Sequence, residues 1–198
     1  MNKILVIVLL LTLAFSRSYP MYKQCDPKWA HEQLGTSSNT ICSAGCLMSS
    51  AAMALKGTGH DFNPSTLNKW LTDHNGYASG DLFVWTSINK FGVSFQGKVA
   101  NSQIKAHLDK GNIVICNVHS GHHWVLAYAY NGNNILVNDP GYSVTSYALS
   151  EIVDGQNGVY KVGNSPILSD ILEGIWHRKK NVRINEGELM EISDGGKL

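Results

Sequence analysis

The sequence has few charged side chains and almost no excess of either sign. Asp, Glu, Lys and Arg make up 16% of its 198 residues, and the formal net charge is +1 at pH 7. Because a nucleic-acid-binding protein needs a strongly basic surface, this balance argues against a nucleic-acid partner. Hydrophobic residues reach 43%, so the chain can bury a core and is expected to fold rather than stay disordered.

The sequence also lacks an internal repeat, a low-complexity stretch and a usable acceptor for N-glycosylation, because Pro64 disqualifies Asn63-Pro64-Ser65. Its length is enough for one domain and too short for two comfortable ones. We therefore expect residues 19–164 to form a single folded domain. The charged and weakly patterned residues 165–198 are expected to be a polar tail.

Only the N-terminus carries a long apolar run. Lys3 precedes Ile4–Phe15, which Thr12 alone interrupts, and small residues follow at Ser16 and Ser18. This order is typical of a secretory signal peptide, and the run is shorter than the roughly 20 residues that a membrane anchor needs. We expect residues 1–18 to be removed and the protein to be secreted, or held in a secretory or lysosomal-type compartment, without membrane association.

Helical patterns dominate the first half of the remaining chain. Ser43–Lys56 carries apolar and small residues at spacings of three and four, which predicts a buried helix. Ser43 is expected to cap its start and Gly57 to end it. Asn63 followed by Pro64 predicts the start of a second helix. Further helices are expected over Asp81–Lys90 and Gln103–Lys110.

Strand patterns dominate the second half. The segments His123–Tyr130 and Asn134–Asn138 flank the turn sequence Asn131-Gly132-Asn133, which predicts a hairpin. Other strands are expected over Val93–Val99 and Ile113–Val118, with edge strands over Tyr142–Tyr147 and Val159–Val162. Helices followed by an antiparallel sheet predict the α+β class rather than a doubly wound parallel fold.

Cys46 lies in the first turn of the first predicted helix. A helix N-terminus presents unpaired N–H groups and a partial positive charge, and both favour a nucleophilic thiolate. Gly45, just before it, leaves room for a substrate backbone. The ordinary alternative in an exported chain is a buried or disulfide-bonded cysteine.

His123 begins a predicted core strand, where alternation places His123, Val125 and Ala127 on one face. A histidine whose ring is held there suits the role of base for a thiol on another element. The alternative is a zinc cluster of His119, His122 and His123. Because neighbouring strand residues point to opposite faces and no second ligand cluster exists, we expect neither a metal nor another cofactor.

Asp139 lies one hairpin turn beyond His123. Pairing of the two strands would bring its carboxylate beside the imidazole, where it would fix the tautomer and stabilise the imidazolium. Asn138 is an alternative, because cysteine hydrolases also use an amide in this role. Asp139-Pro140-Gly141 is equally a turn sequence, and the two roles are compatible.

Taken together, these residues resemble a known family. The segments that carry the resemblance are Gln24–Trp29, Thr40–Cys46 with Ser49, Ser50 and Met53, His123–Val125 and Asn138–Pro140. They are similar to the C39-like family of papain-fold cysteine peptidases, and the likeness extends over most of the chain, from Tyr22 to Tyr160. The family implies a papain-like fold, with Cys46 as nucleophile, His123 as base and Asp139 as the orienting group.

The resemblance also implies an oxyanion hole, made by the side chain of Gln24 and the backbone N–H of Cys46. The segment Ala30–Asn39 widens the gap between these two residues and is expected to loop out. A Cys25–Cys42 disulfide would fasten Gln24 near the site, and it is favoured because a reduced Cys116 in a core strand is ordinary. The alternative pairing is Cys42–Cys116.

Three functions follow from this pattern. The first is a monomeric cysteine peptidase that acts on a peptide or protein, with Tyr77, Trp85 and Trp124 as candidate lining of an apolar subsite. The second is a peptidoglycan or amide hydrolase with the same three residues. The third is an inactive peptide-binding module, in which Cys46 would be disulfide-bonded.

Overall fold

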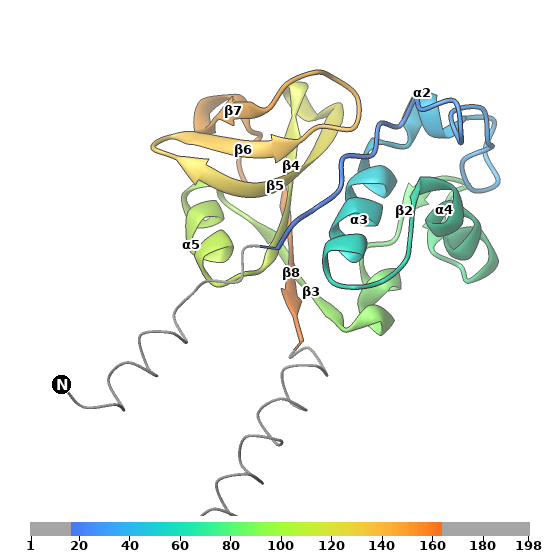
Figure 1. Cartoon of the computed structure of the whole chain (residues 1–198), viewed down its shortest axis with the longest axis horizontal. Coiled ribbons are helices and arrows are strands. Elements are labelled where there is room, and N and C mark those ends of the chain that lie inside the picture. The colour runs from blue at the N-terminus through green and yellow to red at the C-terminus, as the bar shows by residue number, and fades with distance from the viewer. Residues whose placement is uncertain (1–16, 164–198) are drawn as a thin grey trace, which may run out of the picture. The chain divides into compact units, whose positions relative to one another are not determined.

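The computed structural model of the chain describes residues 17–163 (Figure 1). Almost all of the expected signal peptide at residues 1–18 and the whole of the expected tail at residues 165–198 lie outside this range. Within it, no helix is long and apolar enough to cross a membrane.

The helices come early in the chain and begin with a break that the sequence pattern did not reveal. The predicted helix from Ser43 is wrong at its start, because α2 (Ile41–Ala44) and α3 (Cys46–Gly57) are separate helices that meet at Gly45. Thr40, not Ser43, caps α2 through its side chain. A Cβ on Gly45 would lie 2.5 Å from the carbonyl oxygen of Ile41, so only glycine fits this junction.

The next helix, α4 (Pro64–Asp73), starts as predicted, with Asn63 as its cap. The predicted helix over Asp81–Lys90 is wrong in its first part. A small hairpin of β1 (Tyr77–Ala78) and β2 (Leu82–Phe83) comes first, and a 3-10 helix, η1 (Trp85–Phe91), follows it. Ser79 and Gly80 have positive φ angles, and this turn geometry interrupts a helix.

Six antiparallel strands form the main sheet in the order β3-β8-β4-β5-β6-β7. Their bounds are β3 Val93–Val99, β4 Ile113–Val118, β5 His123–Asn131, β6 Asn134–Asn138, β7 Ser146–Ala148 and β8 Asn157–Val162. The α+β class and the β5–β6 hairpin are confirmed. The expectation that Val159–Val162 forms an edge strand is wrong, because β8 lies between β3 and β4 with Val159 and Tyr160 fully buried.

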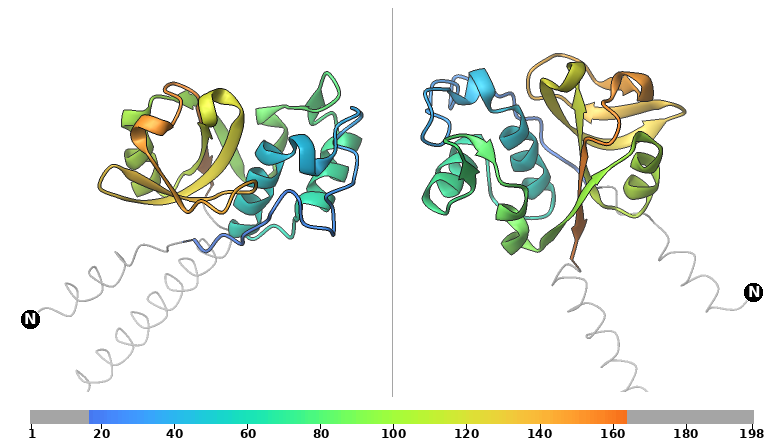
Figure 2. Two further views of the ribbon diagram at one scale, coloured as in Figure 1. Left: turned by 90° about the horizontal axis from the view of Figure 1, so that it is seen from above. Right: turned by 180° about the vertical axis from the view of Figure 1, so that it is seen from behind.

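The sheet is covered on both faces, as Figures 1 and 2 show. On one face Ile115 and Leu126 pack with α3 in a core that also includes side chains of α4. On the other, Val114 and Val125 pack beneath Ile104 of α5 (Ile104–Asp109). Since β4 is buried along its whole length, its pairing with β5 is fixed, and so is the position of β5 relative to α3.

Candidate active site

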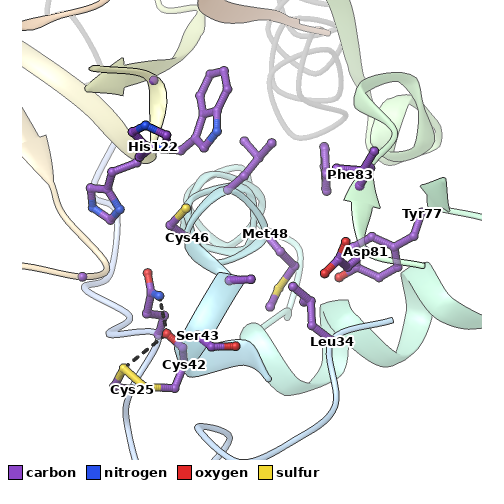
Figure 3. Close-up of a pocket in the computed structure, with 18 of the residues that line it drawn as sticks. Cys25, Leu34, Cys42, Ser43, Cys46, Met48, Tyr77, Asp81, Phe83 and His122 are labelled. Atoms are coloured by element: carbon purple, nitrogen blue, oxygen red, sulfur yellow. Dashed lines mark hydrogen bonds between the residues drawn. A yellow bond between two sulfur atoms is a disulfide. The ribbon is translucent and has the colours of Figure 1, made fainter. Parts of the chain in front are cut away.

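Cys46 is the first residue of α3, and its side chain is half-buried and not in a disulfide. The first hydrogen bond of the helix runs from the N–H of Ser49 to the carbonyl of Gly45, at 2.8 Å. The N–H groups before it have no acceptor within the helix, and Gly45 offers no side-chain cap. The helix therefore presents polarised donors beside the thiol, which lies in a cleft (Figure 3).

His123 is the first residue of β5, and its side chain is 7% exposed. Its Nε2 lies 2.7 Å from Oδ1 of Asp139, and Cys46 lies close enough to the ring to affect its pKa. Burial by itself lowers the pKa of His123, but the hydrogen bond to Asp139 and then the nearby thiol of Cys46 outweigh it and raise the pKa to about 9. The three predicted residues thus form one continuous line.

Asp139 is fully buried and accepts four hydrogen bonds. Its Oδ1 accepts from His123 and from the backbone N–H groups of Gly141 and Tyr142, the latter two at 2.8 Å. Its Oδ2 accepts from the hydroxyl of Tyr147 at 2.7 Å. Burial raises the pKa of the Asp139 carboxyl, but these hydrogen bonds outweigh it and hold the pKa below its usual value. The group is therefore a charged acceptor.

Asn138, the alternative to Asp139, points elsewhere. Its side-chain amide donates to the backbone carbonyls of Tyr19 and Pro20, at 3.2 and 3.1 Å. It therefore fastens the N-terminal segment to β6. Asp139, and not Asn138, is the residue that contacts the His123 ring.

Gln24 lies beside the same cleft and is 8% exposed. Its side-chain Nε2 donates to the carbonyl of Cys42 at 2.6 Å, and its backbone N–H donates to the carbonyl of Pro140 at 2.9 Å. The first bond uses one of the two amide hydrogens, so the second remains for a ligand. The side chain expected from the family resemblance therefore faces the cleft that holds Cys46.

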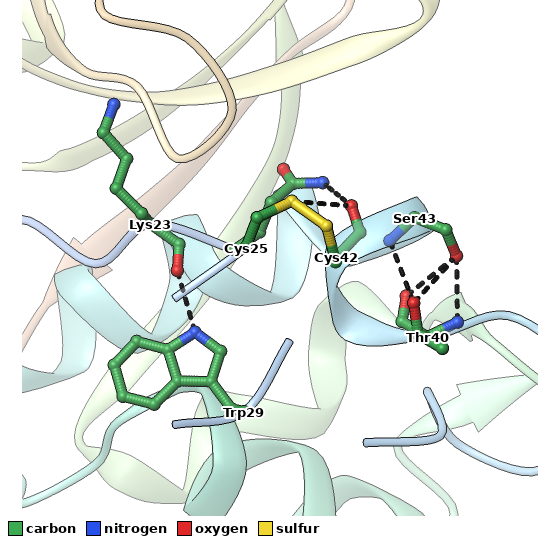
Figure 4. Close-up of a disulfide and its surroundings, with 7 residues drawn as sticks. Lys23, Cys25, Trp29, Thr40, Cys42 and Ser43 are labelled. Carbon is green, nitrogen blue, oxygen red and sulfur yellow. Dashed lines mark hydrogen bonds between the residues drawn. A yellow bond between two sulfur atoms is a disulfide. The ribbon is translucent and has the colours of Figure 1, made fainter. Parts of the chain in front are cut away.

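The disulfide joins Cys25 to Cys42, two residues 17 apart in the sequence (Figure 4). It is the favoured pairing, and Cys116 is buried and reduced. Cys25 is the neighbour of Gln24 in the chain, and the backbone carbonyl of Cys42 accepts the hydrogen bond from the Gln24 side chain. The disulfide therefore holds the donor and the acceptor of this hydrogen bond close together.

The segment Ala30–Asn39 does not simply loop out. Gln33 and Thr40 form a β-bridge, and Leu34 is 2% exposed, in the core beside α3. The segment is built of turns and bends, as expected for a loop, but the buried Leu34 side chain anchors it to the core. Leu34 also lines the cleft.

The cleft has a volume of about 640 Å³. Tyr77 and Trp124 line it as expected, whereas Trp85 does not. Trp85 stacks on Phe95 and Tyr160 instead, over the backbone of Gly158, where a Cβ would lie 1.9 Å from the indole ring. This stacking against the core, and not the cleft, accounts for Trp85.

Across residues 17–163, no three His, Cys, Asp or Glu side chains gather in a group that could hold a metal ion. His123 contacts Asp139 and lies near Cys46, while the side chain of His122 is exposed beside the cleft.

Two residues near the site, Lys23 and Tyr147, were missed by the sequence analysis. The side chain of Lys23 donates to the backbone carbonyls of Asp139 and Tyr142, at 2.7 and 2.5 Å. The hydroxyl of Tyr147 donates to Asp139 and lies 3.1 Å from Nε2 of His119. Since the single tyrosine proton goes to Asp139, His119 is the donor in that second bond. These contacts join distant segments, and no local pattern signals them.

Residues 17–160 match the model of the Peptidase_C39 like family, so the chain belongs to this family of cysteine peptidases. Its fold is similar to that of a double glycine motif protease from an AMS/PCAT transporter, solved in complex with the leader peptide. The TM-score is 0.50 and the identity 14%, over 76% of this chain and 96% of that one.

The second solved structure is the peptidase domain of Streptococcus ComA, a bi-functional ABC transporter involved in a quorum sensing pathway. Its TM-score is 0.47 at 13% identity, over 74% of this chain and all 100% of that one. A comparison with curated protein sequences found no match.

We predict that Gly141→Ala lowers the rate of peptide hydrolysis by about 100-fold, because small displacements of reacting groups are costly. A Cβ at this position would lie 2.7 Å from Cε1 and 3.2 Å from Nε2 of His123, so the ring must shift from the position in which it contacts Asp139. The control is Gly132→Asn in the hairpin turn, where nothing lies within 4 Å of the added Cβ and Asn tolerates the backbone conformation. A folded Gly141→Ala protein with the wild-type rate would contradict this packing.

We also predict that Tyr147→Phe lowers kcat by about tenfold with little change in KM, because a hydrogen bond to a charged group is lost. Tyr147 is a positioning residue, since it acts on Asp139 and not on the substrate. Tyr130→Phe is the matched control, because the hydroxyl of Tyr130 also donates to a carboxylate, that of Asp109, at 2.9 Å but away from the cleft. Equal kcat values for the two variants would show that Asp139 needs no support from Tyr147.

Proposed function

We propose that this protein is a secreted cysteine peptidase in which Cys46, His123 and Asp139 cleave peptide bonds through a thioester acyl-enzyme. The observation that carries the proposal is one cleft that holds both the Cys46 thiol, at the start of α3, and the His123 ring, whose Nε2 lies 2.7 Å from the buried carboxylate of Asp139. Nucleophile, base and orienting group therefore stand in the order that this chemistry requires.

In the first half-reaction, the sulfur of Cys46 forms a bond to the carbonyl carbon of the substrate. Because Asp139 occupies Nε2 of His123, Nδ1 is the nitrogen that serves Cys46 and the leaving amine. The imidazolium donates its Nδ1 proton to the amine as the carbon–nitrogen bond breaks. The products of this step are a free amine and a thioester on Cys46.

In the second half-reaction, His123 takes a proton from water while the water oxygen attacks the thioester carbon. The carbon–sulfur bond then breaks, the acid leaves, and the thiolate of Cys46 and the imidazolium of His123 are restored. Asp139 holds the ring in one tautomer and stabilises its charged form in both steps.

The charge that develops on the carbonyl oxygen also needs donors. The backbone N–H of Cys46 is one, because it lies in the first turn of α3 without an acceptor in the helix. The second amide hydrogen of Gln24 is the other. The Cys25–Cys42 disulfide keeps this amide in place.

Two observations support the substrate class and the location. The similar double glycine motif protease was solved in complex with the leader peptide, which favours a peptide as the substrate here. The Cys25–Cys42 disulfide is expected in an oxidising compartment, in agreement with the signal-like order of residues 1–18.

A peptide library derived from a proteome tests the proposal, with the wild-type protein and Cys46→Ala compared by mass spectrometry. We expect cleavage by the wild type alone, and alkylation by iodoacetamide at Cys46 but not at Cys116, where burial raises the pKa to about 12. Release of muropeptides from cell walls without peptide cleavage would replace the proposal with an amide hydrolase. Absence of both turnover and alkylation would leave a binding module.

A further inference from the structure

One end of the cleft lies away from the reacting groups. Figure 3 shows Leu34, Tyr77, Asp81 and Phe83 gathered across the cleft from His122, with Cys46 between the two sides. These residues come from the segment before α2 and from the β1–β2 hairpin with its turn, and the catalytic line does not involve them.

The chemistry decides which part of a substrate reaches that end. His123 must lie beside the leaving amine, because it protonates this group. The amine begins the C-terminal product, so that product lies on the His123 side of Cys46. The part of the substrate on the N-terminal side of the scissile bond therefore extends the other way, toward Leu34 and Tyr77.

The walls of this end are apolar and held in place before a ligand binds. Leu34 is 2% exposed, and the hydroxyl of Tyr77 donates to the side chain of Asn68 at 3.0 Å. Asn68, itself buried, also accepts from the N–H of Gly35 at 3.1 Å and donates to the carbonyl of Gln33 at 2.8 Å. One buried amide thus ties both walls together.

Asp81 adds a single negative charge to these walls. Among the described residues that line the cleft, it is the only acidic one, and neither lysine nor arginine is present. Its Oδ2 accepts a hydrogen bond from the side chain of Asn39 at 2.7 Å, which orients the carboxylate and leaves Oδ1 for a ligand. In Figure 3 the carboxylate faces Met48, toward the interior of the cleft.

We propose that this end of the cleft is a subsite for a lysine or arginine side chain on the N-terminal side of the scissile bond, with Asp81 binding its charged end. Such a side chain has an apolar stem and a cationic head, which match the walls of Leu34 and Tyr77 and the carboxylate beyond them. An acidic side chain in this subsite would be repelled by the carboxylate of Asp81, and no lysine or arginine of the described residues 17–163 lines the cleft to offset that repulsion. This inference rests on the proposed peptidase function and adds a substrate class to it.

The test uses fluorogenic peptides that differ at one position N-terminal to the cut, with Lys, Arg, norleucine or Glu there. Norleucine keeps most of the lysine stem and lacks the charge. We expect kcat/KM to be roughly fivefold higher with Lys or Arg than with norleucine, as for a partly exposed ion pair. The ratio of kcat/KM for the Lys peptide to kcat/KM for the norleucine peptide should fall to about one in Asp81→Asn. It should also fall to about one for the wild type in roughly 1 M salt, where the Debye length is near 3 Å. Asp73→Asn, which removes an exposed carboxylate on α4, should leave the ratio unchanged.

Equal rates with Lys and norleucine, or a preference that persists in Asp81→Asn, would overturn the subsite while leaving the peptidase intact. If the wild type cleaves none of the peptides, the proposed function fails instead. Fluorescence anisotropy with Cys46→Ala then decides the subsite without turnover. Tighter binding of the Lys peptide, lost on adding Asp81→Asn, supports the subsite, and equal or absent binding overturns it.

Discussion

Replacing His123 by alanine is expected to lower kcat/KM for peptide hydrolysis by at least about 10,000-fold, because residues that act as one catalytic unit lose most of their effect together. Without the ring, Cys46 has no group to receive its proton and the leaving amine has no acid. Asp139 loses its partner as well, since its Oδ1 lies 2.7 Å from the missing nitrogen. The initial rate on a fluorogenic peptide measures this loss.

The neighbouring residue provides a matched control. His122 is also a histidine beside the cleft, but its side chain is exposed, and within residues 17–163 it makes no hydrogen bond to Asp139 or Cys46. His122→Ala should cost less than about tenfold, as an exposed substitution outside the catalytic contacts does. Equal losses in the two variants would mean that the cleft as a whole, and not the His123 ring, is responsible.

Asp139→Asn is expected to reduce kcat by about 1,000-fold or more, because a neutral amide does not stabilise the charged imidazolium and its single oxygen cannot accept all four hydrogen bonds that Asp139 accepts. The hydrogen bond from His123 to Asp139 is the largest contribution that raises the pKa of His123 to about 9. With that pKa the ring keeps its proton through neutral pH and loses it as the pH rises through about 9. In the variant the pKa should fall, so the ring should be neutral at pH values where the wild type is charged.

An NMR titration of the His123 ring measures this change directly, beside the pH profile of kcat. The control is Asp154→Asn, because Asp154 also accepts a backbone hydrogen bond, from Asn101 at 2.7 Å, without lining the cleft. A His123 pKa that is unchanged in Asp139→Asn would show that the carboxylate does not hold the proton on the ring.

Local patterns predicted much of this fold. The strands Val93–Val99, Ile113–Val118 and Asn134–Asn138 begin and end where the sequence places them, because alternation and turn residues act over a few positions. The position of β8 between β3 and β4 was not predictable in this way. It depends on pairing between segments far apart in the chain, and such pairing leaves no local period.

The residues of the candidate site also fall into those that a local sequence pattern indicates and those that it does not. Cys46 and His123 stand out because each occupies the start of a regular element, where a helix end or a strand end defines its surroundings. Tyr147 and Lys23 do not stand out, since each reaches Asp139 from a segment that carries no catalytic pattern. Gly141 looks like an ordinary turn residue until the His123 ring is seen against it.

The three cysteines at the cleft need opposite oxidation states. Cys25 and Cys42 must be oxidised to hold Gln24 against the carbonyl of Cys42, whereas Cys46 must be reduced to act as a nucleophile. Strongly reducing surroundings would release the amide from its anchor, and strongly oxidising ones would consume the thiol. The proposed enzyme is therefore suited to a bounded range of redox conditions, because a bond that must stay oxidised and a thiol that must stay reduced line the same cleft.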